Sequence, residues 1–331
     1  MSVVASTLTT RSRGKSIAAL ALVLAGCGSA PAPAAPPTAP PPVESVSATP
    51  APTTPAPAAS TPTPTPTDCP DPAWSCTQQH RFAAAAAHAR RVSGPDGHLA
   101  VVFVDRTTGA TWRTGDTGRP GWTASTIKLA IAADLLARDR AGTVDLTAAD
   151  RRDMAGMLNF SDEAASDRLW KAYGGADMLD RFRTRFGMTA LRFVPGFSRS
   201  VYWGFVRCST DDLAHLMQHV LTATDPADRA YLVAAMRGVA RNQQWGVWAA
   251  GADQRPGNKD GWSFESDPGG RHWVTDTVGF AGPDERYVVA VMDQLDPAGT
   301  LPQGVHAVSD LVALLFGRPV PAPVTVPAPD G

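Results

Sequence analysis

Lysine is rare in this sequence, and the few lysines present are therefore informative. Among 30 basic residues only four are lysines, at positions 15, 128, 171 and 259, so arginine carries almost every positive charge. A buried lysine amine can lose its proton and act as a base, whereas a guanidinium cannot. Lys128 and Lys259, which lie near serines and glycines in the folded part, are the first candidates for chemistry.

Lys128 follows Ser125 by three positions in the stretch Ser-Thr-Ile-Lys, at the start of a predicted apolar helix. Spacing of three places both side chains on one helix face. A serine hydroxyl needs a neighbouring base to act as a nucleophile, and the amine can supply it. The alternative is an N-cap serine followed by a surface lysine. The apolar residues on both sides of Lys128 argue against that alternative.

Lys259 begins the stretch Lys-Asp-Gly-Trp at the start of a predicted strand. Its charge could neutralise a substrate carboxylate or tune the serine. Gly261 would let a ligand approach the backbone, with Asp260 and Trp262 beside it. The alternative for Lys259 is an exposed turn lysine.

A third stretch, Ser161-Asp162-Glu163, lies between two predicted helices. A serine in a site can relay a proton between an amine and a leaving group. The alternative is a helix N-cap, for which serine and aspartate are equally suited.

The elements that must position these residues follow from the pattern of apolar residues. The expected order is a helix, two strands, an all-helical middle, three strands and a last helix. Strands from both ends of the chain should form one antiparallel sheet, with the helical middle as a second lobe and a cleft between them. The expected ranges are 78–92, 99–105, 110–114, 125–138, 147–170, 177–186, 210–221, 258–264, 273–280, 287–293 and 305–316.

The first 67 residues are typical of an exported, tethered protein. Residues 1–26 have a basic start and a short apolar run, and they end before Cys27 in Leu-Ala-Gly-Cys, which resembles a bacterial lipobox. Residues 27–67 are rich in Pro, Ala and Thr, which favours an extended, disordered tether. We expect a protein that is exported and lipid-anchored at Cys27 to the outer face of the cell membrane. An ordinary secretory signal is the alternative.

Residues 68–318 are expected to form one domain, followed by a disordered tail at 319–331. Cys69 and Cys76 are the expected disulfide pair, which leaves Cys208 as a buried free thiol, although pairing of Cys208 with either remains open.

Composition excludes some classes of protein. The formal net charge of −1 gives no sign of nucleic-acid binding. His215 and His219 lie four apart on a predicted helix, but the glutamate of a zinc protease is missing between them, which favours a surface pair. We expect no metal and no cofactor, and a monomer.

The three stretches, in this order, resemble the S-x-x-K, S-D-N and K-T-G set of class A β-lactamases and penicillin-binding proteins. The resemblance covers residues 78–316 and suggests a lipoprotein of actinobacterial type. It implies an α/β (α+β) fold in which helices flank an antiparallel sheet beside an all-helical lobe. It makes Ser125 the nucleophile, Lys128 its base and Ser161 a proton relay. Lys259 would form the wall of the site with Gly261. The backbone N–H groups of Ser125 and Trp262 would form the oxyanion hole.

The sequence also departs from this family. Glu163 stands where the family has asparagine, and Asp260 where it has threonine. Residues 181–210, where the deacylating glutamate should lie, contain neither Asp nor Glu. We therefore expect an acyl-enzyme at Ser125, formed from a β-lactam or a peptidoglycan-type peptide, that hydrolyses slowly. The alternative is a cell-wall-binding lipoprotein that keeps the fold without turnover.

Overall fold

The computed structural model describes residues 69–197 and 202–329. The stretch containing the expected signal, Cys27 and the tether lies outside these residues. The helices and the strands of the main sheet follow one another in the order that the sequence predicts. They are α1 (Cys76–Ser93), α2 (Ile127–Arg140), α3 (Ala148–Asn159), α4 (Glu163–Ala172), α5 (Met178–Phe186), α6 (Thr210–Thr222), α7 (Pro226–Arg237) and α8 (Leu301–Leu315).

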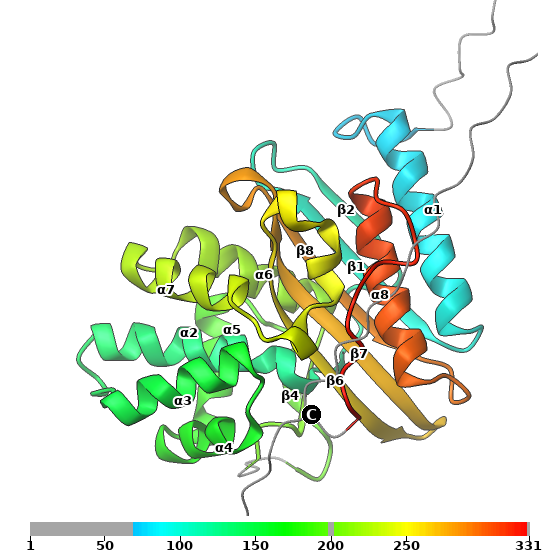
Figure 1. Ribbon diagram of the computed structural model, residues 1–331. Helices are drawn as coiled ribbons and strands as arrows, with labels where there is room; N and C mark the ends of the chain where they lie inside the picture. The colour runs from blue at the N-terminus through cyan, green and yellow to red at the C-terminus, as the bar shows by residue number, and fades with distance from the viewer. Residues whose placement is uncertain (1–68, 198–201, 330–331) are drawn as a thin grey trace, which may run out of the picture. The chain divides into compact units, whose positions relative to one another are not determined.

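Strands from both ends of the chain form one five-stranded antiparallel sheet, as predicted, in the order β2-β1-β8-β7-β6 (Figure 1). The first and last thirds meet where β1 pairs with β8, with Val102 opposite Ala290. β6 has a partner on one side only and is an edge strand of this sheet. The strands are β1 (His98–Asp105), β2 (Thr111–Thr114), β6 (Gly257–Asp267), β7 (Gly270–Ala281) and β8 (Tyr287–Gln294).

Both faces of the sheet are covered, because successive side chains of a strand point to opposite faces. Val101 and Phe103 of β1 pack in the core on the side of α1 and α8. Val102 and Val104 pack in the core of the helical lobe. The helices in the middle of the chain therefore pack against the second face of the sheet.

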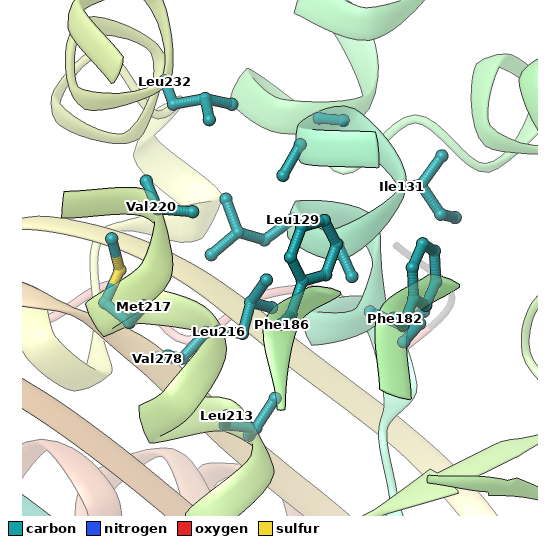
Figure 2. Packing of buried hydrophobic residues seen from close by; sticks show 14 of the residues in the cluster. Leu129, Ile131, Phe182, Phe186, Leu213, Leu216, Met217, Val220, Leu232 and Val278 are labelled. Atoms are coloured by element: carbon teal, nitrogen blue, oxygen red, sulfur yellow. The ribbon is translucent and has the colours of Figure 1, made fainter. Parts of the chain in front are cut away.

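The core of the helical lobe is built around α2 (Figure 2). Leu129 and Ile131 of α2 lie among aliphatic and aromatic side chains from α5, α6 and α7. Val278 of β7 joins this core from the sheet. The start of α2, with Ser125 just before it, is thus fixed against both the lobe and the sheet.

Two features were not expected from the sequence. Residues 226–237 form α7, whose N-cap Asp225 accepts a hydrogen bond from the backbone of Ala227 and is followed by a proline at the first turn. A small second sheet joins β3 (Gly121–Trp122), β5 (Val206–Cys208) and β4 (Arg192–Phe193). Its strands have only two or three residues, too few to show a period.

The cysteines follow the prediction. Cys69 and Cys76 form a disulfide with their Cα atoms 5.3 Å apart. Cys208 is a buried free thiol, and burial raises the pKa of that thiol well above its ordinary value.

The tail differs from the prediction of disorder for 319–331. In its described part, residues 319–329, the backbone N–H of Ala322 donates to Asp310 Oδ1 at 2.7 Å, and Ala322 is buried. Val324 and Val326 pack against the core on the α8 side. Prolines restrict the unfolded chain and so reduce the entropy lost when this segment orders.

None of the helices within the described ranges has the length and apolar character needed to cross a membrane.

Asp293 of β8 is a buried carboxyl with one hydrogen bond, from Ser93 Oγ at 2.7 Å, while its Oδ1 has no partner among the described residues. Burial raises the pKa of Asp293 to about 7. A carboxyl whose pKa is raised on folding costs stability as the pH climbs from its unfolded value to its folded value.

The free energy of unfolding should therefore fall between about pH 4 and pH 7, at about 1.4 kcal/mol per unit of pKa shift at most. Asp293→Asn should make this decline shallower by the contribution of Asp293, while the buried Asp260 keeps its own, as measured by urea unfolding at several pH values. Exposed Asp116, changed to Asn, is the control and should leave the decline in place. Parallel curves for the wild type and Asp293→Asn would contradict the prediction.

Candidate active site

Ser125 lies on a strained turn just before α2. Ala124 has a φ of +40°, a left-handed conformation that is uncommon outside glycine, and a 3₁₀ turn spans Ala124–Thr126. Two hydrogen bonds fix this turn. Thr123 Oγ1 donates to the carbonyl of Val206 at 3.1 Å, and Thr126 Oγ1 donates to the carbonyl of Thr123 at 2.6 Å. Strain that is held in this way marks positions where geometry matters for function.

Lys128 is fully buried beneath this turn. Its Nζ donates to the Ser161 carbonyl at 2.7 Å and lies 3.1 Å from Ser161 Oγ. Burial, followed by the nearby charge of Lys259, holds the pKa of Lys128 well below its ordinary value. A neutral amine at this position can accept a proton.

The sequence left open whether Ser161 faces the site or caps a helix, and in the structure Asp162 takes the N-cap position instead. Asp162 is the N-cap of α4, where its Oδ1 accepts a hydrogen bond from the backbone of Ala165 at 2.9 Å. Ser161 has a φ of +61°, and both its carbonyl and its hydroxyl face Lys128. The hydroxyl of Ser161 is therefore available to the site and does not cap the helix.

The two candidate lysines meet at Ser161. Lys259 is also buried, and its Nζ lies 3.1 Å from Ser161 Oγ while donating to the carbonyl of Asp260 at 2.8 Å. Burial lowers the pKa of Lys259 to about 8. We expected both amines to converge on Ser125. Among the residues that the structure describes, the hydroxyl they share is that of Ser161, with Ser125 in the adjoining pocket.

β6 approaches the Ser125 turn so closely that only glycine fits at position 261. A Cβ there would lie 2.7 Å from the backbone nitrogen of Ser125 and 2.9 Å from that of Thr126. This contact brings the backbone of β6 beside the N–H groups at the start of α2. Donors fixed in this way suit the stabilisation of an oxyanion.

Asp260 does not line the pocket, although we expected it to bind substrate. In β6 its neighbour Lys259 is opposite Val278, which faces the helical lobe, whereas Asp260 is opposite Thr277 and faces away. Thr277 Oγ1 donates to Asp260 Oδ1 at 2.6 Å. Burial raises the pKa of Asp260 to about 7. Alternation along the strand would have given this placement from the sequence.

A cavity of about 580 Å³ opens beside Ser125 and Ser161. Glu163 and Trp262 line it, as expected. Phe160 lines it as well and is 65% exposed, an unusual position for a large apolar side chain. A volume of this size suits a small molecule or the end of a peptide.

Trp203 is a further residue near the site that the sequence analysis missed. Its ring lies 4.3 Å from Lys128 Nζ. Trp203 belongs to the stretch 181–210, which lacks carboxylates. This stretch therefore places an aromatic ring beside the Lys128 amine. No motif marks such a tryptophan, because its role depends on where the loop returns to the core.

The described residues include no group of three His, Cys, Asp or Glu side chains that could hold a metal ion. His215 and His219 have separate partners, since His215 Nδ1 lies 3.1 Å from the carbonyl of Gly187 and the ring of His219 packs on Phe186.

Gly261→Ala should disturb both the fold and the site, since the added methyl group collides with backbone rather than with a flexible side chain. Overpacking of this kind costs about 1–3 kcal/mol. We expect the melting temperature to fall by several degrees in a thermal scan, at roughly 2–4 °C per kcal/mol. Gly269→Ala is the control, because a Cβ at position 269 meets nothing within 4 Å. Equal melting temperatures for the two variants would show that β6 does not lie so close to the Ser125 turn.

No family model matches this chain. Proteins named lipoprotein LppW, from Mycobacterium tuberculosis strain H37Rv and from Mycobacterium bovis, are 32% identical over 210 residues. The match covers 60% of this chain and 64% of each relative, so it spans slightly less than two thirds of their length.

Solved β-lactamases have a similar structure. A β-lactamase from Burkholderia vietnamiensis matches with a TM-score of 0.58 and 20% identity, over 71% of this chain and 95% of that one. One from Sphaerobacter thermophilus matches with a TM-score of 0.56 and 22% identity, over the same shares. An ancestral class A β-lactamase matches at 0.54 and 19%, over 72% and 98%. The chain therefore has the β-lactamase-like fold that its motifs predict.

Proposed function

We propose that this protein is an exported, lipid-anchored serine acyl-transfer enzyme that reacts with β-lactams or peptidoglycan-type peptides through Ser125. The observation that carries the proposal is the pair of buried amines, Lys128 and Lys259, on either side of Ser161 Oγ and next to the Ser125 pocket. Burying two lysines costs a large desolvation free energy. A site with no chemical role would not need both. Export and anchoring rest on residues 1–67 and on the name of the mycobacterial relatives.

In the proposed reaction the neutral amine of Lys128 takes the proton of the Ser125 hydroxyl, directly or through Ser161. Ser125 Oγ then attacks the carbonyl carbon of the substrate. The backbone N–H groups of Ser125 and Trp262 hold the oxyanion. The Ser161 hydroxyl accepts a hydrogen bond from Lys259 and passes its proton to the leaving nitrogen as the C–N bond breaks, and the protonated amine of Lys128 returns a proton to Ser161. The product of this half-reaction is an ester at Ser125.

We propose that the ester is long-lived. Deacylation needs a group that activates water, and residues 181–210 supply no carboxylate. The carboxylates that line the cavity are those of Asp162 and Glu163. Asp162 already caps α4, which leaves Glu163 at the rim. Slow hydrolysis would make the protein a poor β-lactamase.

The second candidate is a cell-wall-binding lipoprotein without turnover. It is favoured by the side chain of Asp260, which is turned away from the pocket, and by Glu163, which stands where the family has an amide. Such a protein would bind a peptidoglycan fragment equally well with or without the Ser125 hydroxyl.

A fluorescent penicillin separates the two candidates. The purified domain should become labelled, and Ser125→Ala should abolish labelling. Lys128→Met should slow it by about 10²–10⁴-fold, the usual contribution of a general base. Lys171→Met is the matched control, because Lys171 is exposed and pairs only with Asp167 among the described residues.

We also expect the label to persist during a chase with unlabelled penicillin, with little hydrolysis of nitrocefin. Labelling that survives the loss of Ser125, or no labelling at any penicillin concentration, would reject the enzyme in favour of the binding protein.

A further inference from the structure

The C-terminal segment 319–329, which we call the strap, runs from the end of α8 across the domain toward the active site (Figure 1). It is held along the way by the bond from the Ala322 N–H to Asp310 and by the valines at 324 and 326. Pro327 is buried as well. The first part of the strap is thus attached to the domain at several points.

The last part of the strap reaches the catalytic pocket. Trp262 Nε1 donates to the carbonyl of Ala328 at 3.0 Å. Pro329 then lines the same cavity as Ser125, Ser161 and Glu163. A residue 204 positions beyond Ser125 in sequence therefore forms part of the wall beside the nucleophile.

This end of the strap is held weakly compared with its start. Ala328 and Pro329 are exposed, and the bond from Trp262 is the one hydrogen bond that they make with the described residues. A single hydrogen bond contributes about 0.5–1.5 kcal/mol net. The tip can therefore leave the pocket while the valines and Ala322 keep the rest of the strap in place.

We propose that the strap is an autoinhibitory element, in which the Trp262–Ala328 contact holds Pro329 at the pocket and limits entry to Ser125. Its biological consequence rests on the proposed function, because a strap over an inert pocket would regulate nothing. If the strap is closed about nine-tenths of the time, entry is slowed about tenfold, since only the open fraction can bind.

The test measures entry without acyl transfer. In Ser125→Cys, iodoacetamide alkylates the new thiol, and the rate is followed by intact-protein mass spectrometry. Ser125→Ala gives the background from buried Cys208. We expect alkylation to be about tenfold faster when the chain ends at Val326, because this truncation removes Pro329 and the acceptor of the Trp262 bond.

Two full-length variants guard against a truncation that fails to fold. Trp262→Phe loses the donor to Ala328 but keeps an aromatic ring, and it should speed alkylation in the same direction. Pro323→Ala changes an exposed strap residue away from the pocket and should leave the rate unchanged. Trp262→Phe in the truncated chain should add nothing further, because both changes break one contact.

Equal alkylation rates in the full, truncated and Trp262→Phe chains would overturn the proposal that the strap limits entry to Ser125. Additive effects of the two changes would overturn it as well, since they would show that Trp262 acts without Ala328. Absence of penicillin labelling in every chain would reject the proposed function alone, because alkylation still reports whether the pocket is covered.

Discussion

The structure depends on two buried amines that share one hydroxyl. Lys128 comes from α2, Lys259 from β6, and Ser161 from the turn between α3 and α4, so the contact joins the sheet to the helical lobe. Each amine has lost its water, and Lys259 adds to the electrostatic cost at Lys128. Loss of a proton removes the charge and with it this free-energy penalty, which is why the pKa of a buried amine falls. The lowered pKa of Lys128 is therefore a consequence of how the lobes meet.

Other features of the fold hold Lys128, Lys259 and Ser161 in place. Gly261 lets β6 lie against the Ser125 turn, and the left-handed backbone at Ser161 aims its carbonyl and hydroxyl at Lys128. Trp203 adjoins the same amine with an aromatic ring.

The sequence predicted the fold well, because the signals were local. The rarity of lysine identified Lys128 and Lys259, and the apolar periods located the sheet and the helical lobe. What it could not predict depended on tertiary contacts: which hydroxyl the amines share, the position of Trp203, and the packing of the strap around Ala322. The orientation of Asp260 was predictable from strand alternation but was missed.

The most direct measurement of the central claim is the protonation of the lysines themselves. With four lysines in the chain, ¹³C labelling of lysine gives few NMR signals, and lysine-to-arginine variants assign them. The account predicts that Lys259 titrates near pH 8 and Lys128 at a pH well below the ordinary lysine value. Signals of Lys128 and Lys259 that both titrate near the ordinary lysine value of about 10.4 would show that the amines are solvated and apart, and would contradict the account.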